Sequence, residues 1–192
     1  MAIRKFLLFS FVTVLFFSCA GVPFYTSDHP LATEVVKSAD GTIQSRIPLG
    51  WFASNDPSLA PQYLFWLIKD DYSGTITLQE VKVDRATGRR INKEGLNLLA
   101  EISMAFKKES TDKFLQTKPI ELFTINTNSY SGFEYYSDGT SRRIRVVVFK
   151  MGNRYFEATA MPLSGVWYEK DLRGLLNALH SFLNSLYSSY SS

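Results

Sequence analysis

Aromatic and other apolar residues recur along residues 129–137, 140–151 and 154–161, and turn residues separate these segments, which predicts three β-strands. The pairs Asp138-Gly139 and Gly152-Asn153 separate these segments and are typical of two-residue hairpin turns. The pattern therefore predicts an antiparallel sheet of three consecutive strands.

Two-residue turns would set the register of this sheet, pairing Ser137 with Thr140 and Met151 with Arg154. One face then carries Tyr136, Glu134, Arg143, Arg145, Val147, Phe149, Phe156, Ala158 and Ala160. The other face carries Phe133, Tyr135, Ile144, Val146, Val148, Tyr155 and Met161. In this register Glu134 lies directly across from Arg143. Both faces are substantially apolar, so both need a covering layer.

Two longer segments repeat apolar residues at helical spacing. One runs from about Asn92, a suitable N-cap residue, to Lys108, and the other from about Val166 to Leu186 along a leucine-rich stripe. Two amphipathic helices beside a two-sided sheet predict helices on opposite faces of that sheet. The expected fold class is α+β, a mainly antiparallel sheet with helices on both faces in an α/β/α sandwich.

The length of 192 residues suits one domain with a sizeable core. Further strands are expected at residues 42–49, 63–69, 75–83 and 120–127. Residues 70–74 form a hairpin connection between the second and third of these. We place the single domain at residues 41–187, followed by a disordered polar tail at 188–192.

The N-terminus has the composition of an export signal. Arg4 and Lys5 precede an almost unbroken apolar run of 12 residues, 6–17. This run is too short for a helix that crosses about 30 Å of hydrocarbon. The segment therefore predicts secretion and not a membrane span.

The apolar run ends at Ser18-Cys19-Ala20, which resembles the lipobox of bacterial lipoproteins, although Phe16 stands where that motif usually has Leu. The resemblance implies that residues 1–18 are a lipoprotein signal peptide and that Cys19 carries the lipid, palmitate included. Ala20 after the cysteine, instead of Asp, implies an outer-membrane location facing the periplasm. The alternative is a buried structural thiol at Cys19.

Residues 19–40 contain two prolines, scattered polar residues and no sustained hydrophobic period. This composition predicts a flexible tether behind the lipidated cysteine. About 20 flexible residues reach roughly 25 Å root-mean-square, which would hold the domain just off the membrane.

The order of the expected elements resembles the fold shared by the PsbP, Mog1 and DcrB proteins over roughly residues 40–187. The residues that carry the resemblance are Ile47-Pro48-Leu49-Gly50-Trp51, Gly132-Phe133-Glu134, Arg154-Tyr155-Phe156-Glu157-Ala158 and His180-Ser181-Phe182. Members of that group do unrelated jobs and share binding to other proteins, not a catalytic site. The resemblance therefore implies a PsbP/Mog1-like binding domain without choosing among such jobs.

The charge balance argues against nucleic acid as a partner. Lys and Arg number 21 and Asp and Glu 18, and removal of Arg4 and Lys5 with the signal leaves a net charge of +1. Catalytic motifs are absent from the sequence, and its two histidines lie at His29 in the expected tether and His180 on the last helix. We expect a partly exposed His180, no enzyme activity, no cofactor and no metal site.

Three groups of charged residues remain as candidates for binding. Asp70, Asp71 and Ser73 offer oxygens to calcium, or form a solvated turn, which the ligand spacing favours. A basic run covers residues 85–93. The main basic group is Arg142, Arg143, Arg145 and Arg154, a candidate partner surface. Each basic group either is a solvated face or meets anionic headgroups or an acidic partner. For the main group, cross-strand pairing of Arg143 and Arg145 with Glu134 is a further alternative.

These observations predict a non-catalytic, lipid-anchored accessory protein of the bacterial cell envelope that acts through protein–protein interaction. The predicted partners are the membrane, through the anchor, and another envelope protein. A small-ligand or metal-binding lipoprotein with a pocket between sheet and helix is the second hypothesis, and an unrecognised hydrolase is the third. An aromatic-lined cavity above about 300 Å³ would favour the second, and a charged or apolar patch the first.

Overall fold

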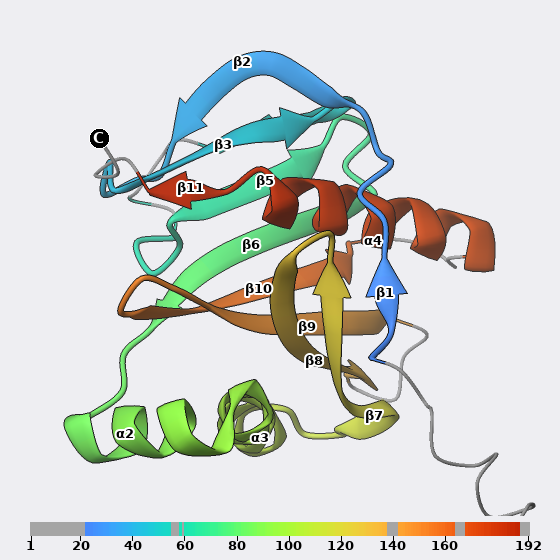
Figure 1. Ribbon diagram of the computed structural model, residues 1–192. Helices are drawn as coiled ribbons and strands as arrows, with labels where there is room; N and C mark the ends of the chain where they lie inside the picture. Colours follow the sequence, from blue (N-terminus) through green and yellow to red (C-terminus); the bar gives the residue numbers. More distant parts are fainter. Residues whose placement is uncertain (1–21, 55–57, 59, 138–141, 164–167, 189–192) are drawn as a thin grey trace, which may run out of the picture.

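The computed structural model describes residues 22–54, 58, 60–137, 142–163 and 168–188, which form two β-sheets and three helices (Figure 1). The strands are β1 (Phe24–Tyr25), β2 (Leu31–Lys37), β3 (Ile43–Pro48), β4 (Trp51–Ala53), β5 (Phe65–Lys69), β6 (Gly74–Val81), β7 (Leu115–Ile125), β8 (Asn128–Tyr136), β9 (Arg143–Met151), β10 (Arg154–Pro162) and β11 (Tyr187–Ser188). The helices are α2 (Arg85–Glu94), α3 (Leu96–Ser110) and α4 (Glu169–Asn184).

The larger sheet has the strand order β1-β7-β8-β9-β10-β6-β5-β4. Its neighbouring strands pair antiparallel except β1 and β7, which run parallel. A smaller sheet, β11-β3-β2, pairs antiparallel throughout. The predicted α+β class with a mainly antiparallel sheet is confirmed.

Two separate hydrophobic clusters cover the two faces of the large sheet, with α4 on one side and α2 and α3 on the other (Figure 1). The α4 side includes Val147, Phe149, Phe156 and Leu179, whereas the opposite side includes Phe133, Val146, Val148 and Leu99. Alternating residues of β9 thus enter different cores. The prediction of helices on opposite faces is confirmed.

The predicted strand register is right at one hairpin and wrong at the other. Met151 pairs with Arg154 as expected, around Gly152, whose φ of 60° suits a residue without a side chain. Glu134, however, pairs with Arg145 and not with Arg143. The shift is two residues, because β8 ends and β9 begins further from the turn than a two-residue loop requires. A shift of two keeps every side chain on its predicted face.

The middle helix begins earlier than predicted and is divided. Asp84 and not Asn92 is the N-cap, and its carboxylate accepts the Thr87 N–H at 2.7 Å. Asn92 lies inside α2. Gly95, with φ of 92°, separates α2 from α3, because that backbone conformation interrupts a helix.

The segment expected to be a flexible tether is partly built into the two sheets. β1 pairs with β7, and β2 pairs with β3 along its length. At the other end of the chain, β11 pairs with β3 and includes Ser188. The ordered domain therefore begins well before residue 41, because long-range pairing orders strands that have weak local patterns.

The expected signal peptide, with Cys19, lies outside the described residues. Within the ranges that the structure describes, none of the helices combines the length and apolar character needed to cross a membrane.

Candidate functional site

The two arginines inside β9 belong to a buried ionic cluster and not to an exposed surface. Arg145 is only 3% exposed and its guanidinium lies 2.8 Å from Glu121 Oε1 and 3.5 Å from Glu134 Oε1. Arg143 donates to the other oxygen of Glu134, which is itself 1% exposed, and Lys118 Nζ lies 3.3 Å from Oε1. The prediction that Arg143 and Arg145 form a partner surface is wrong for Arg145, because α4 and its core cover that face.

The other two predicted surface arginines lie at opposite ends of the sheet strands. Arg142 is exposed just before β9. Arg154 begins β10 and is half-buried, with Nη2 2.7 Å from Glu80 and 3.1 Å from Asp40. Hydrogen bonding to Glu80 raises the pKa of Arg154. The four arginines therefore do not form one surface.

A second group of cationic side chains lines an open groove between α2, the end of β6 and the β9–β10 turn. The groove has a volume of about 630 Å³. We call it the basic groove, and its lining residues are Glu80, Val81, Lys82, Val83, Asp84, Arg85, Gly88, Arg89, Asn92, Lys150, Asn153, Arg154 and Tyr155. It joins the basic run of residues 85–93 to the cations near the β9–β10 turn, two features that are separate in the sequence.

Hydrogen bonds at the floor of the groove attach α2 to the sheet. The Tyr155 hydroxyl lies 3.2 Å from the Gly88 carbonyl and 3.1 Å from Asn92 Oδ1. Lys150 Nζ donates to the same Asn92 oxygen at 2.8 Å and lies 5.8 Å from the centre of the Tyr155 ring. A Cβ at Gly88 would lie 3.9 Å from the Tyr155 ring, an ordinary van der Waals contact, so α2 packs directly against this ring. The groove thus has a fixed floor.

The rim of the groove carries an excess of positive charge. Five cationic side chains line it against two carboxylates, Glu80 and Asp84. Glu80 is paired with Arg154, and the Thr87 N–H that caps α2 lowers the pKa of Asp84. Among the described residues, no carboxylate lies within ion-pair distance of Lys82, Arg85 or Arg89. These exposed cations are available to an anionic ligand.

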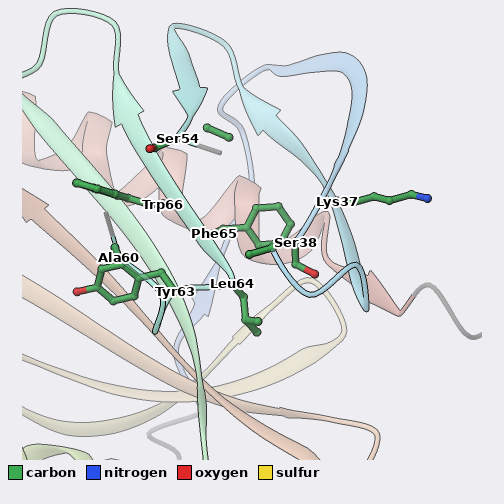
Figure 2. Close-up of a pocket in the computed structure, with 10 residues that line it drawn as sticks. Lys37, Ser38, Ser54, Ala60, Tyr63, Leu64, Phe65 and Trp66 are labelled. Atoms are coloured by element: carbon green, nitrogen blue, oxygen red, sulfur yellow. The ribbon is translucent and has the colours of Figure 1, made fainter. Parts of the chain in front are cut away.

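A smaller cavity of about 190 Å³ lies where the β2–β3 connection meets the start of β5 (Figure 2). Small side chains such as Ser38, Ser54 and Ala60 line it with Tyr63 and Trp66, and Lys37 points away from it (Figure 2). Its volume is below the roughly 300 Å³ typical of small-molecule sites. It does not lie between sheet and helix, where the second hypothesis places a pocket. The basic groove does lie between α2 and the sheet and exceeds that volume, but it is lined mainly by charged side chains, with Tyr155 as the one aromatic residue among the described residues that line it.

The remaining candidates for chemistry have structural roles. His180, expected to be partly exposed, is 5% exposed and packs against Tyr25, and burial followed by the charge of Arg145 lowers its pKa to about 4. Asp71 accepts hydrogen bonds from Lys69 and Ser73 within the β5–β6 hairpin, as the turn hypothesis predicts. In the described part of the chain, no three His, Cys, Asp or Glu residues lie close enough together to hold a metal ion.

Sequence reasoning missed the basic groove because its two halves meet only through long-range pairing. Tyr155 pairs with Val81, and this register brings the β9–β10 turn beside the segment that leads into α2. The available signal was the presence of two basic runs with few acidic residues. Only the pairing of β6 with β10 shows that these two basic segments line the same groove.

No protein-family model matches this chain, and no curated protein matches it. Similar solved structures include a PsbP from Synechocystis sp. PCC 6803, at 10% identity over 89% of this chain and 97% of that chain, with a TM-score of 0.49. The Ran-binding protein Mog1p of Saccharomyces cerevisiae has 11% identity over 82% and 96% of the two chains, with a TM-score of 0.46. LpqN of Mycobacterium tuberculosis, described as involved in cell envelope biogenesis, has 15% identity over 86% and 98%, with a TM-score of 0.46.

PsbP and Mog1 are among the proteins whose fold is predicted from the sequence to be similar. At these identities and TM-scores, the likeness carries no statement about activity, substrate or partner.

Proposed function

We propose that this protein is a non-catalytic accessory protein of the bacterial envelope, anchored through lipid on Cys19, whose basic groove binds an acidic segment of a protein partner. The observation that carries the proposal is the excess of exposed, unpaired cations in a groove with a hydrogen-bonded floor.

The shape and chemistry of the groove support a peptide-like ligand. Lys82 lies in the connection from β6 to α2, and Arg85 and Arg89 lie on α2; all three line one continuous space with Lys150. An extended acidic segment presents several carboxylates along such a row, whereas an enclosed apolar cavity suits a small neutral ligand. Cations of this kind steer an anionic partner and set its register, and their effect weakens with salt.

The sequence supports the anchor. The export signal ends at Ser18-Cys19, where acylation would occur. Cys19→Ser is expected to leave a precursor that is not acylated and that washes off membranes in high salt. Incorporation of labelled palmitate and membrane fractionation measure the two effects. Equal retention of the wild type and the variant would contradict the anchor.

The groove is tested with a fluorescent poly-glutamate peptide and the full-length protein. Arg85→Glu with Arg89→Glu is expected to weaken peptide binding by about tenfold or more at low ionic strength, and by less as salt screens the charges. The matched control is Lys113→Glu with Lys170→Glu, which makes the same change in net charge at exposed positions outside the groove. The control is expected to change affinity by less than about twofold, because these charges lie outside the binding site.

Two outcomes would contradict the groove as the binding site. One is equal loss of affinity in both variants, which would mean that net charge alone determines binding. The other is unchanged affinity in the groove variant at every salt concentration. Full competition by a small anion such as inorganic pyrophosphate would instead favour the small-ligand hypothesis.

A further inference from the structure

We propose that one edge of the large sheet, formed by β1 and the C-terminal part of β7, rests on the membrane that holds the anchor. We call this surface the anchor-side edge and define it by Val22, Phe24 and Leu122. The inference rests on the proposed lipid at Cys19 and adds to it the orientation of the domain.

Only a short length of chain connects the proposed lipid to the folded domain. The Thr124 N–H donates to the Pro23 carbonyl at 3.0 Å, and Phe24 pairs with Thr124, so the chain is held in the sheet from Pro23 onward. Three residues lie between Cys19 and Pro23, and the four residue-to-residue steps span at most about 14 Å. The polar headgroup layer on each side of the hydrocarbon is itself roughly 5–8 Å thick. The domain is therefore held close to the bilayer and is not separated from it by the flexible 20-residue tether that the sequence predicted.

The short connection brings a surface with exposed apolar side chains to the membrane. Val22 is 52% exposed, Phe24 61% and Leu122 39%, although all three are large and apolar. In the parallel register of β1 and β7, Phe24 pairs with Thr124. Continuing this register two residues before β1 would bring Val22 and Leu122 to the same face as Phe24. Exposed apolar side chains gathered at one site mark an interaction surface.

The position of this surface favours lipid as its occupant over a second copy or another protein. Because the anchor enters the domain at the anchor-side edge, the nearest apolar phase is the bilayer itself. Apolar side chains at the headgroup boundary add to the binding that acyl chains provide. A short β1 at the sheet edge also leaves unpaired backbone groups, which polar headgroups and water at the interface can satisfy.

This orientation has a consequence for the basic groove. In the sheet order, β10 lies four strands and β6 five strands from β1. Figure 1 shows β1 on one side of the molecule and α2 with the β9–β10 turn on the other. The groove therefore faces away from the bilayer, where an acidic protein segment reaches it and the headgroups do not.

Single-cysteine labelling of the lipidated protein tests the orientation, because Cys19 is the only cysteine and its thioether does not react with thiol probes. A fluorophore is attached to Val22→Cys, Leu122→Cys or Asn153→Cys, the last of these lining the groove. Each protein is reconstituted in phosphatidylethanolamine and phosphatidylglycerol vesicles, with and without nitroxide-labelled lipid. Near-UV circular dichroism confirms that each variant is folded.

Quenching by the nitroxide lipid is expected to be about fivefold stronger at positions 22 and 122 than at position 153. Retention on vesicles with equal quenching at all three positions would overturn the orientation while leaving the anchor intact. Failure of the wild-type protein to carry lipid and stay on the vesicles would overturn the anchor, and the orientation with it.

Discussion

Arginine and glutamate or aspartate side chains occur both in the buried ionic cluster on β8 and β9 and in the basic groove. They are mostly buried in the cluster and mostly exposed in the groove. In the cluster, Arg145 and Glu134 are nearly inaccessible and satisfy one another with Glu121. In the groove, Arg85 and Arg89 are exposed and lie on a helix whose capping carboxylate, Asp84, is already engaged by the backbone. The cluster holds the sheet together, whereas the groove leaves charge available for a partner.

The comparison shows that an arginine-rich run in a sequence does not by itself identify a binding surface. Burial decides the role, because a buried charge needs a partner within the protein while an exposed one loses little free energy when unpaired. Mutations should therefore separate the two regions by their effects on stability and on binding.

The largest effect is expected for Arg145→Ala. The substitution removes the 2.8 Å partner of Glu121 and leaves Glu134 buried with less compensation. We expect a loss of about 3–5 kcal/mol in the free energy of unfolding, measured by urea denaturation. Arg85→Ala, in the groove, serves as the control and should cost less than about 0.5 kcal/mol. Similar losses in the two variants would remove the distinction between the regions.

The next effect concerns pH and the imidazole beside the buried cluster. Burial lowers the pKa of His180 to about 4, against about 6.5 in the unfolded chain, so only the unfolded chain takes up this proton as pH falls through that interval. The contribution to stability is therefore present above pH 6.5 and lost towards pH 4, by about 3 kcal/mol.

His180→Phe keeps an aromatic ring against Tyr25 and lacks the titrating group. The difference in unfolding free energy between wild type and variant, measured at pH 7 and pH 4.5, isolates the imidazole from the carboxylates that also titrate. The expected result is a smaller acid-induced loss in the variant. An identical pH dependence in the two proteins would mean that His180 is not held neutral by burial.

A smaller effect of opposite sign is expected for Arg85→Glu. The first turn of α2 contains no acidic residue, and a negative charge there interacts favourably with the helix dipole. We expect a gain of about 0.3–1 kcal/mol in stability, measured by thermal unfolding, together with weaker peptide binding. A destabilisation comparable to that of Arg145→Ala would show that Arg85 also has a structural role.

The smallest effect is expected at Ser181, which follows His180 on α4. Within the described residues, its hydroxyl is the one buried side-chain polar atom without a hydrogen-bond partner. Ser181→Ala removes an uncompensated polar group, so the variant should be more stable by up to about 1 kcal/mol in urea denaturation. A loss above that size would point to a hydrogen bond made by the hydroxyl in solution.

The strands around the β9–β10 hairpin were predictable because their signals are local. Successive side chains of a strand point to opposite faces, which assigns each of residues 154–161 to a face, and Gly152 supplies the positive φ that the turn requires. β8 ends at Tyr136 and β9 begins at Arg143, so the two-residue turn assumed from the sequence placed Glu134 opposite the wrong arginine. Strand faces follow from periodicity, whereas register depends on loop length.

Other elements were missed because tertiary contacts define them. α2 is strongly polar and buries only Ile91, so few apolar residues mark its buried side. β2 is mostly exposed, and its order comes from pairing with β3. The basic groove depends on the same kind of long-range pairing, between β6 and β10. Single-sequence periodicity does not report contacts of this range.

The first strand, β1, and the last strand, β11, each pair with a strand that is distant in sequence, and this affects the rate of folding. Tyr187 of β11 donates to Gln44 of β3, 143 positions earlier, and β1 pairs with β7 across about a hundred residues. Contacts so distant in sequence form only after the entropy of closing long loops has been overcome, which slows folding. The small sheet cannot be completed until residue 188 has been synthesised. If the protein is exported as proposed above, this connectivity would give the chain time to cross the membrane unfolded.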